Sequence, residues 1–173
     1  MAVSVMVLET ERLFLRQLTP DDDAFILELL NEPGFLENIG DRQVRDLEGA
    51  RRYVAEGPAA SYVQHGFGLW WVGLKDTAEP VGICGLIKRE VLDHPDIGYA
   101  FLARFSGRGF ASEAGVAVLD YGRKALGLGR IVAITKPDND GSIRVLEKIG
   151  LKFDGMVTLP DHGGESRYFV SDA

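Results

Sequence analysis

The sequence lacks the features that mark several large classes of protein. It has a single cysteine, Cys84, among 173 residues, which excludes an internal disulfide and a metal site built from several cysteines. Its longest apolar runs are far shorter than the roughly 20 residues of a membrane-spanning helix. Its opening residues, MAVSVMVL, carry no basic segment of the kind that begins a secretion signal. We therefore expect a cytoplasmic protein that does not associate with a membrane and holds no metal.

Basic residues are also few. The chain has 19 lysines and arginines against 26 acidic residues, which gives a net charge of −7. This balance argues against a nucleic-acid partner, because binding to nucleic acid relies on neutralising phosphates with basic side chains. It favours, weakly, a cationic partner. No repeat and no linker rich in proline or serine divides the sequence, so we expect one domain over residues 1–173.

The pattern of apolar residues predicts a mixed α/β fold. Strands are expected at 12–18, 68–75, 80–88, 96–103, 129–135, 151–158 and 165–171. Helices are expected from about Thr19 to Leu30, over 46–56 with a continuation over 59–64, from the glycine-rich loop to about Leu126, and over 140–149. Short loops between the middle strands indicate antiparallel hairpins. The helical connection from 96–103 to 129–135 indicates one parallel crossover.

A glycine-rich stretch, RFSGRGFASEA at 104–114, lies between that strand and that helix. Gly107 and Gly109 have no Cβ, so the backbone can turn sharply and approach a ligand closely. Free N–H groups at a helix N-terminus attract anions, and Arg104 and Arg108 add positive charge. The stretch therefore predicts a phosphate-binding loop, with an ordinary strand-to-helix turn and solvated arginines as the alternative.

The kind of phosphate ligand is narrowed by what surrounds the loop. Gly107-x-Gly109-x-x-Ser112 comes close to the dinucleotide-binding fingerprint, but such loops open their fold, whereas this one follows more than one hundred residues. No acidic residue ends the next strand, which reads IVAIT. The G-K-[ST] of a nucleotide triphosphate loop is absent. These observations disfavour both NAD and ATP.

Three separated motifs resemble the GCN5-related N-acetyltransferases (GNAT). Arg104-x-x-Gly107-x-Gly109, continuing as FASEA, is similar to the pyrophosphate loop of that superfamily, in the form typical of ribosomal-protein-alanine N-acetyltransferases. LETERLFLR at 8–16 and NDGSIRVLEKIGL at 139–151 resemble two further segments of that branch. The three motifs occur in the same order as in the family and cover nearly the whole chain.

The resemblance implies a GNAT fold, a mostly antiparallel sheet with helices on both faces, in which strands 96–103 and 129–135 are parallel but splay apart to admit coenzyme A. It implies that the backbone of Arg108, Gly109, Phe110, Ala111 and Ser112 holds the pyrophosphate. The edge at Phe101 and Leu102 would pair with the pantetheine arm as an added strand. Asn139 would bind that arm, and Ser142 would lie near the sulfur.

The function that the resemblance implies is transfer of an acetyl group from acetyl-CoA to a primary amine, by direct attack in a ternary complex. The acceptor is either a protein N-terminus or a small amine, and a homodimer is compatible with the sequence. A non-catalytic acyl-CoA-binding sensor is the alternative. A ping-pong mechanism through Cys84 is disfavoured, because that residue lies in an apolar strand and is expected to be buried.

The proton path is the least determined part of the site. An alkylamine has a pKa near 10 and must lose a proton, for which Asp96 and Glu90, at strand ends, are candidates alongside a role as plain surface carboxylates. A backbone N–H near Leu102 is implied for the oxyanion. The tyrosine that often protonates the thiolate in this superfamily is replaced by Leu146, so Ser142 or water would serve, or no acid is needed.

Overall fold

The structure is a computed structural model and describes residues 4–160 and 162–172. Eight strands form one sheet in the order β1-β2-β3-β4-β5-β6-β8-β7. Their bounds are Met6–Glu9 (β1), Leu13–Arg16 (β2), Leu69–Leu74 (β3), Pro80–Ile87 (β4), Asp96–Phe101 (β5), Val132–Thr135 (β6), Lys152–Leu159 (β7) and Gly164–Val170 (β8). All neighbours are antiparallel except β5 and β6. This confirms the predicted mixed α/β sheet.

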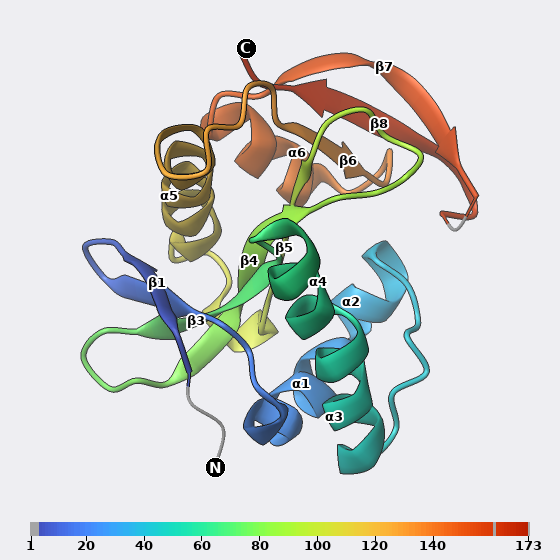
Figure 1. The fold of residues 1–173 in the computed structure, drawn as a ribbon. Helices are drawn as coiled ribbons and strands as arrows, with labels where there is room; N and C mark the ends of the chain where they lie inside the picture. Colours follow the sequence, from blue (N-terminus) through green and yellow to red (C-terminus); the bar gives the residue numbers. More distant parts are fainter. Residues whose placement is uncertain (1–3, 161, 173) are drawn as a thin grey trace.

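Helices cover both sides of the sheet, with α1 to α4 on one side and α5 and α6 on the other (Figure 1). Their bounds are Asp23–Leu30 (α1), Pro33–Asn38 (α2), Leu47–Glu56 (α3), Pro58–His65 (α4), Phe110–Lys124 (α5) and Asp140–Lys148 (α6). Two short 3₁₀ turns, Pro20–Asp22 and Ala103–Phe105, precede α1 and follow β5. None of the helices in the described ranges is long and apolar enough to cross a membrane.

The parallel pair β5–β6 separates soon after it begins. Within the described chain, the one registered pair between these strands is Asp96 opposite Val132, and the Val132 N–H donates to the Pro95 carbonyl at 2.9 Å. Beyond this point the sheet continues on β4 at one side and on β8 at the other. The predicted splay is therefore present, and it leaves one edge of β5 unpaired.

A core of buried aliphatic and aromatic side chains lies on both faces of the sheet. Trp70 packs edge-on against Tyr121 of α5, with ring centroids 5.5 Å apart. Trp71 faces the other side and is covered by the Arg16 guanidinium, 4.0 Å from the ring centroid, and by Phe14. Both tryptophans are at most 4% exposed, and neither lines the cavity described below.

Two elements of the fold were not predicted from the sequence. Strand β1 pairs with β2 through a bulge, and its residues did not alternate clearly enough to suggest a strand. Helix α2 begins at Pro33, three residues after the expected end of the preceding helix at Leu30, where no second helix was predicted. Proline is well suited to the first position of a helix. Helix α2 is the more consequential of the two, because it forms part of the site.

Candidate active site

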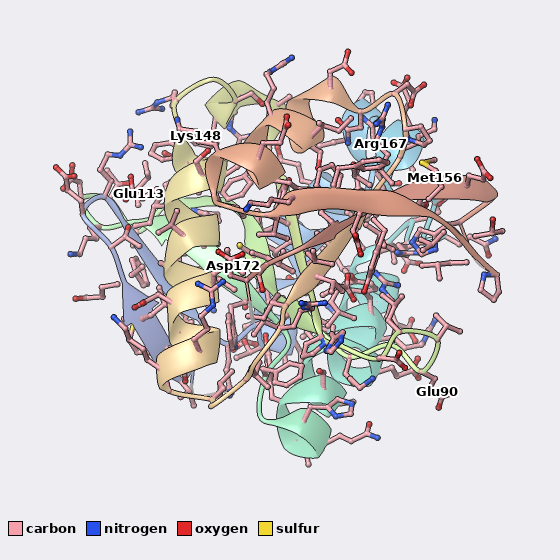
Figure 2. All side chains as sticks on the ribbon, turned by 90° about the horizontal axis from the view of Figure 1, so that it is seen from above. Glu90, Glu113, Lys148, Met156, Arg167 and Asp172 are labelled. Atoms are coloured by element: carbon pink, nitrogen blue, oxygen red, sulfur yellow. The ribbon has the colours of Figure 1, made fainter. Side chains whose placement is uncertain are left out.

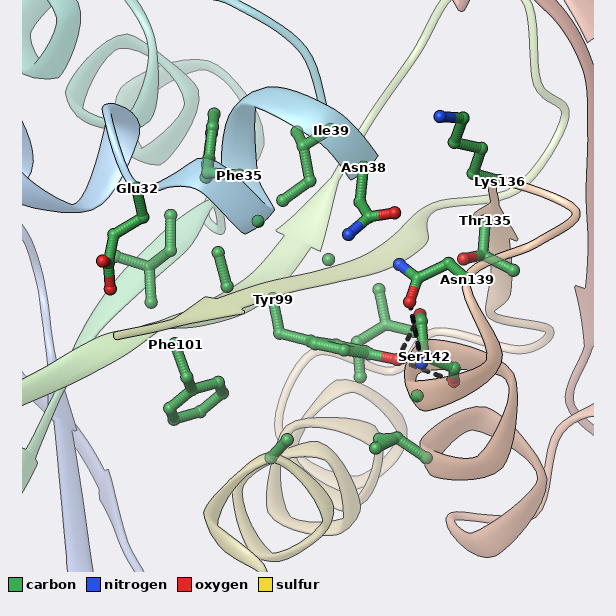
Figure 3. Close-up of a pocket in the computed structure, with 18 of the residues that line it drawn as sticks. Glu32, Phe35, Asn38, Ile39, Tyr99, Phe101, Thr135, Lys136, Asn139 and Ser142 are labelled. Atoms are coloured by element: carbon green, nitrogen blue, oxygen red, sulfur yellow. Dashed lines mark hydrogen bonds between the residues drawn. The ribbon is translucent and has the colours of Figure 1, made fainter. Parts of the chain in front are cut away.

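A cavity of about 880 Å³ occupies the gap between the splayed strands. Its walls come from β5, the loop before α5, the first turn of α5, the start of α6 and helix α2 (Figure 3). The predicted site residues that line it are Asp96, Phe101, Gly107, Gly109, Phe110, Ala111, Ser112, Asn139 and Ser142. Residues from four separate parts of the sequence are thus brought together around one space.

The glycine-rich loop forms one end of the cavity. Gly107 and Gly109 have φ of +77° and +81°, a left-handed conformation that favours glycine strongly. Gly109 is the N-cap of α5, and its carbonyl accepts the first helical hydrogen bond, from the Glu113 N–H at 3.0 Å. The N–H groups of the three preceding residues therefore have no earlier turn to donate to. These residues, Phe110, Ala111 and Ser112, line the cavity.

A carboxylate holds this helix start against the N-terminal hairpin. Glu113 accepts hydrogen bonds from the Thr10 hydroxyl at 2.5 Å, the Arg12 backbone N–H at 2.9 Å and the Arg12 Nε at 2.7 Å. Burial alone raises the pKa of Glu113, but these hydrogen bonds outweigh it and the pKa is lowered. Figure 2 shows Glu113 on α5 beside that hairpin. The contact links the LETERLFLR segment to the FASEA segment, which the sequence alone did not reveal.

The two arginines of the loop do not line the cavity. Arg104 forms an ion pair with Glu28 of α1, and Arg108 lies over the Phe110 ring, 4.9 Å from its centroid. Both side chains are exposed. The prediction that Arg104 pairs with the cofactor phosphate is therefore not met in this structure, because a carboxylate already holds it.

The backbone of β5 corrects the predicted position of the oxyanion donor. The Leu102 N–H donates to the Val81 carbonyl of β4 at 2.9 Å, and the Leu102 side chain is fully buried. In an antiparallel ladder successive residues direct their N–H groups to alternate edges. Tyr99 and Phe101 therefore direct theirs into the gap, whereas Leu102 faces β4. The prediction of Leu102 as oxyanion donor and as cofactor contact is therefore wrong by one residue, because the last N–H of β5 that faces the gap belongs to Phe101.

Asn139 and Ser142 lie at the start of α6 and face β5 across the gap. The Asn139 Oδ1 caps the helix by accepting from the Ser142 N–H at 3.3 Å, which leaves its amide nitrogen directed at the cavity. The Ser142 hydroxyl is 2.8 Å from the phenol of Tyr99, and the same phenol donates to the Ser142 carbonyl at 3.2 Å. Burial raises the pKa of Tyr99, so the phenol keeps its proton. Sequence reasoning missed Tyr99 because nothing local marks it.

Asp96 lies at the closed end of the gap. Its side chain is almost completely buried, and one oxygen accepts from the Arg89 Nε at 3.0 Å. Burial raises the pKa of Asp96 to about 6, although the Arg89 charge and hydrogen bond work in the opposite direction. A carboxylate with this pKa accepts a proton more readily at neutral pH than an ordinary aspartate does.

Replacing Asp96 by asparagine should change how stability depends on pH. The pKa of Asp96 is 3.8 in the unfolded chain and about 6 in the folded protein. Between these two pH values the folded state binds more protons than the unfolded state, so the folded protein loses stability as the pH rises from 3.8 to about 6. The difference corresponds to about 3 kcal/mol. Urea unfolding at pH 3.5 and 7.5 should show Asp96→Asn gaining that amount relative to the parent. Parallel pH profiles of the two proteins would contradict the assignment.

Glu90 and Cys84 are not part of the cavity. Glu90 is exposed on the loop between β4 and β5 and borders a separate, smaller depression (Figure 2). It is therefore wrong as a candidate base. Cys84 is fully buried in β4, and burial raises the pKa of its thiol, which opposes a role as a nucleophile. In the parts of the chain described, no three histidine, cysteine or acidic side chains gather as metal ligands would.

Comparison with known proteins identifies the family of this chain. Residues 12–152 match the family model described as an acetyltransferase (GNAT) domain. The "Uncharacterized N-acetyltransferase YoaA" of Bacillus subtilis is 32% identical over 87% of this chain and 85% of its own length. An acetyltransferase structure from Agrobacterium tumefaciens has a TM-score of 0.83 and 26% identity, and the alignment covers 100% of this chain and 98% of that one.

A fourth match concerns the fold alone. The structure titled RimL, a ribosomal L7/L12 α-N-protein acetyltransferase in complex with coenzyme A, has a TM-score of 0.81 at 17% identity, covering 96% of this chain and 97% of its own. The two chains therefore share a fold. With a family model that spans most of its length, this chain belongs to the GNAT acetyltransferases.

Proposed function

We propose that this enzyme transfers the acetyl group of acetyl-CoA to a primary amine by direct attack within a ternary complex. The observation that carries the proposal is the unpaired edge of β5 next to the helix start of α5. An extended pantetheine arm would add to this edge as a strand, and the pyrophosphate would bind the free N–H groups of the first turn. The thioester would then lie beside Tyr99, in the part of the cavity between β5 and α6.

The chain's own groups would support each part of the reaction. The Tyr99 N–H, directed into the gap, stabilises the oxyanion as the amine forms its bond to the carbonyl carbon. Asp96, at the closed end, takes the ammonium proton directly or through water. As the carbon–sulfur bond breaks, the attacking nitrogen loses its second proton to water, and the thiolate takes a proton from the Ser142 hydroxyl, which is held by the Tyr99 phenol. Solvent then restores the serine proton.

The alternative of a non-catalytic sensor loses its main support. That alternative rested on the missing tyrosine at position 146, where Leu146 is a buried core residue. The hydroxyl pair of Tyr99 and Ser142 supplies a proton donor at the same cavity from different positions. Amide formation therefore needs no group that the described chain lacks.

Release of free thiol from acetyl-CoA tests the proposal. With a panel of primary amines and short peptides, we expect amine-dependent thiol release and an acetylated product detected by mass spectrometry. Calorimetry should show coenzyme A binding without any acceptor. Binding of coenzyme A with no turnover on any acceptor would favour the sensor, and binding of NADH in place of coenzyme A would overturn the proposal.

A further inference from the structure

The β5 strand divides the cavity into two halves of different character. Side chains alternate along a strand, so Tyr99 and Phe101 project toward α5 and α6, whereas Gly98 and Ala100 face the side of α2. Figure 3 shows this division, with Tyr99 and Phe101 on one side of the strand and α2 on the other. The coenzyme-binding groups described above lie in the first half. The second half is therefore the space left for the acceptor.

The floor of the acceptor half is apolar. On β4, Gly85 lies opposite Leu69 of β3 at one edge and opposite Gly98 of β5 at the other. Ile83, two residues before Gly85 on β4, lies opposite Ala100 of β5. These residues therefore share one face of the sheet. Leu69, Ile83, Gly98 and Ala100 all line the cavity. The small side chains on β5 keep the floor open beside the reacting centre.

The roof of the acceptor half presents two large apolar side chains, beside the polar residues Glu37 and Asn38, and is held in place. Phe35 and Ile39, from α2 and its C-cap, face the floor. The side chain of Ile39 is 38% exposed, which for a large aliphatic residue lining a cavity leaves apolar surface uncovered. The Lys136 ammonium donates to the Glu37 carbonyl at 3.1 Å and ties α2 to the end of β6.

The charged groups in this half offer little to a polycation. Asp96 is paired with Arg89, and the Glu32 carboxylate accepts the Ala103 N–H at 2.6 Å. Arg42 and Lys136 add positive charge to the lining. Glu37 is a third carboxylate in the lining, so Asp96, Glu32 and Glu37 are matched in number by Arg42, Arg89 and Lys136. A polyamine would therefore bring extra ammonium groups into a space with an apolar floor and no excess of carboxylates, at a high desolvation cost.

From this we infer that the acceptor is a small primary amine carried on a compact apolar group, alkyl or aryl-alkyl, and not a polyamine. The inference rests on the proposed acetyl transfer and narrows its substrate. It runs against the weak preference for cationic partners suggested by the net charge of −7, because charge on the outer surface does not determine the polarity of this cavity.

An amine panel separates the acceptor classes. Phenethylamine and isopentylamine represent the apolar class, spermidine the polyamines, and an alanine-initiated hexapeptide a protein N-terminus. We expect kcat/KM for the two apolar amines to exceed that for spermidine and for the peptide by at least about tenfold, since burying two or three methylenes contributes more than that. A preference for spermidine or for the peptide would overturn the inference.

Two variants on α2 test whether the apolar roof is responsible. Ile39→Asp puts a charge at the acceptor half and should raise KM for phenethylamine about tenfold, with KM for acetyl-CoA unchanged. Leu36→Asp is the matched control, because Leu36 belongs to the same short helix, is also 38% exposed and does not line the cavity. Equal behaviour of the two variants would refute the apolar acceptor half.

Calorimetry with coenzyme A distinguishes failure of this inference from failure of the proposed function. If coenzyme A binds and a polar amine or the peptide is the preferred acceptor, only the inference falls. If coenzyme A binds and none of the acceptors turns over, the apolar acceptor is refuted together with catalysis. If coenzyme A does not bind at all, the proposed function itself is wrong.

Discussion

Replacing Gly107 by valine should abolish measurable binding of coenzyme A while leaving a folded protein. Gly107 lines the cavity with φ of +77°, and a Cβ placed there meets no protein atom within 4 Å. The added side chain therefore occupies only space that the proposed pyrophosphate would need. Losing even two charge-assisted hydrogen bonds costs about 3 kcal/mol, so calorimetry should show affinity weakened by about 100-fold or more.

Gly127→Val is the matched control for that prediction. Gly127 has φ of +67°, has the same empty surroundings for a Cβ, and lies in the loop after α5 rather than in the cavity. Both variants force valine into the left-handed region, at about 1–2 kcal/mol, so both should unfold at a similarly lowered temperature. Equal loss of coenzyme A binding in the two variants would attribute the effect to strain and contradict the phosphate-loop assignment.

The parts of the site that the sequence predicted are those set by local signals. The glycines of the loop, the helix that follows them and the short helix predicted over 140–149 each depend on residues within a few positions of one another, and the structure has all of them. The parallel pairing of β5 and β6 also followed from element order, because a helical connection between neighbouring strands makes them parallel, whereas their splay was implied by the family resemblance. These features needed no knowledge of distant contacts.

The parts that the sequence did not predict depend on distant contacts. Tyr99 acquires its role from Ser142, 43 positions later, and Arg104 is held by Glu28, 76 positions earlier. The error at Leu102 has a related cause, since a shift of one residue in strand register reverses the edge to which an N–H points. Periodicity along one strand does not fix that register. The hydrogen bond to Val81 does.

Removing the Ser142 hydroxyl should slow the chemical step without weakening coenzyme A binding. Its Oγ lies 2.8 Å from the Tyr99 phenol, which also donates to the Ser142 carbonyl. When the phenol donates to the Ser142 Oγ in place of the carbonyl, the serine proton is free for the departing thiolate. General acid catalysis contributes about 100-fold or more, so Ser142→Ala should lower kcat by about 100-fold with KM for acetyl-CoA little changed.

Tyr99 is expected to act through Ser142, and a double variant tests this dependence. Tyr99→Phe should lower kcat by about tenfold, because the serine hydroxyl loses the partner that orients it, and the double variant should be no slower than Ser142→Ala alone. Tyr121→Phe is the control, because that phenol lies on α5 against Trp70, outside the cavity.

Additive losses in the double variant would show that the two hydroxyls work separately. Unchanged kcat in Ser142→Ala would mean that the thiolate leaves without an acid, as its pKa near 8.5 permits. In that case the hydroxyl pair would only brace β5 against α6. The proposed oxyanion contact from the Tyr99 backbone would still stand, because it depends on strand register and not on either side chain.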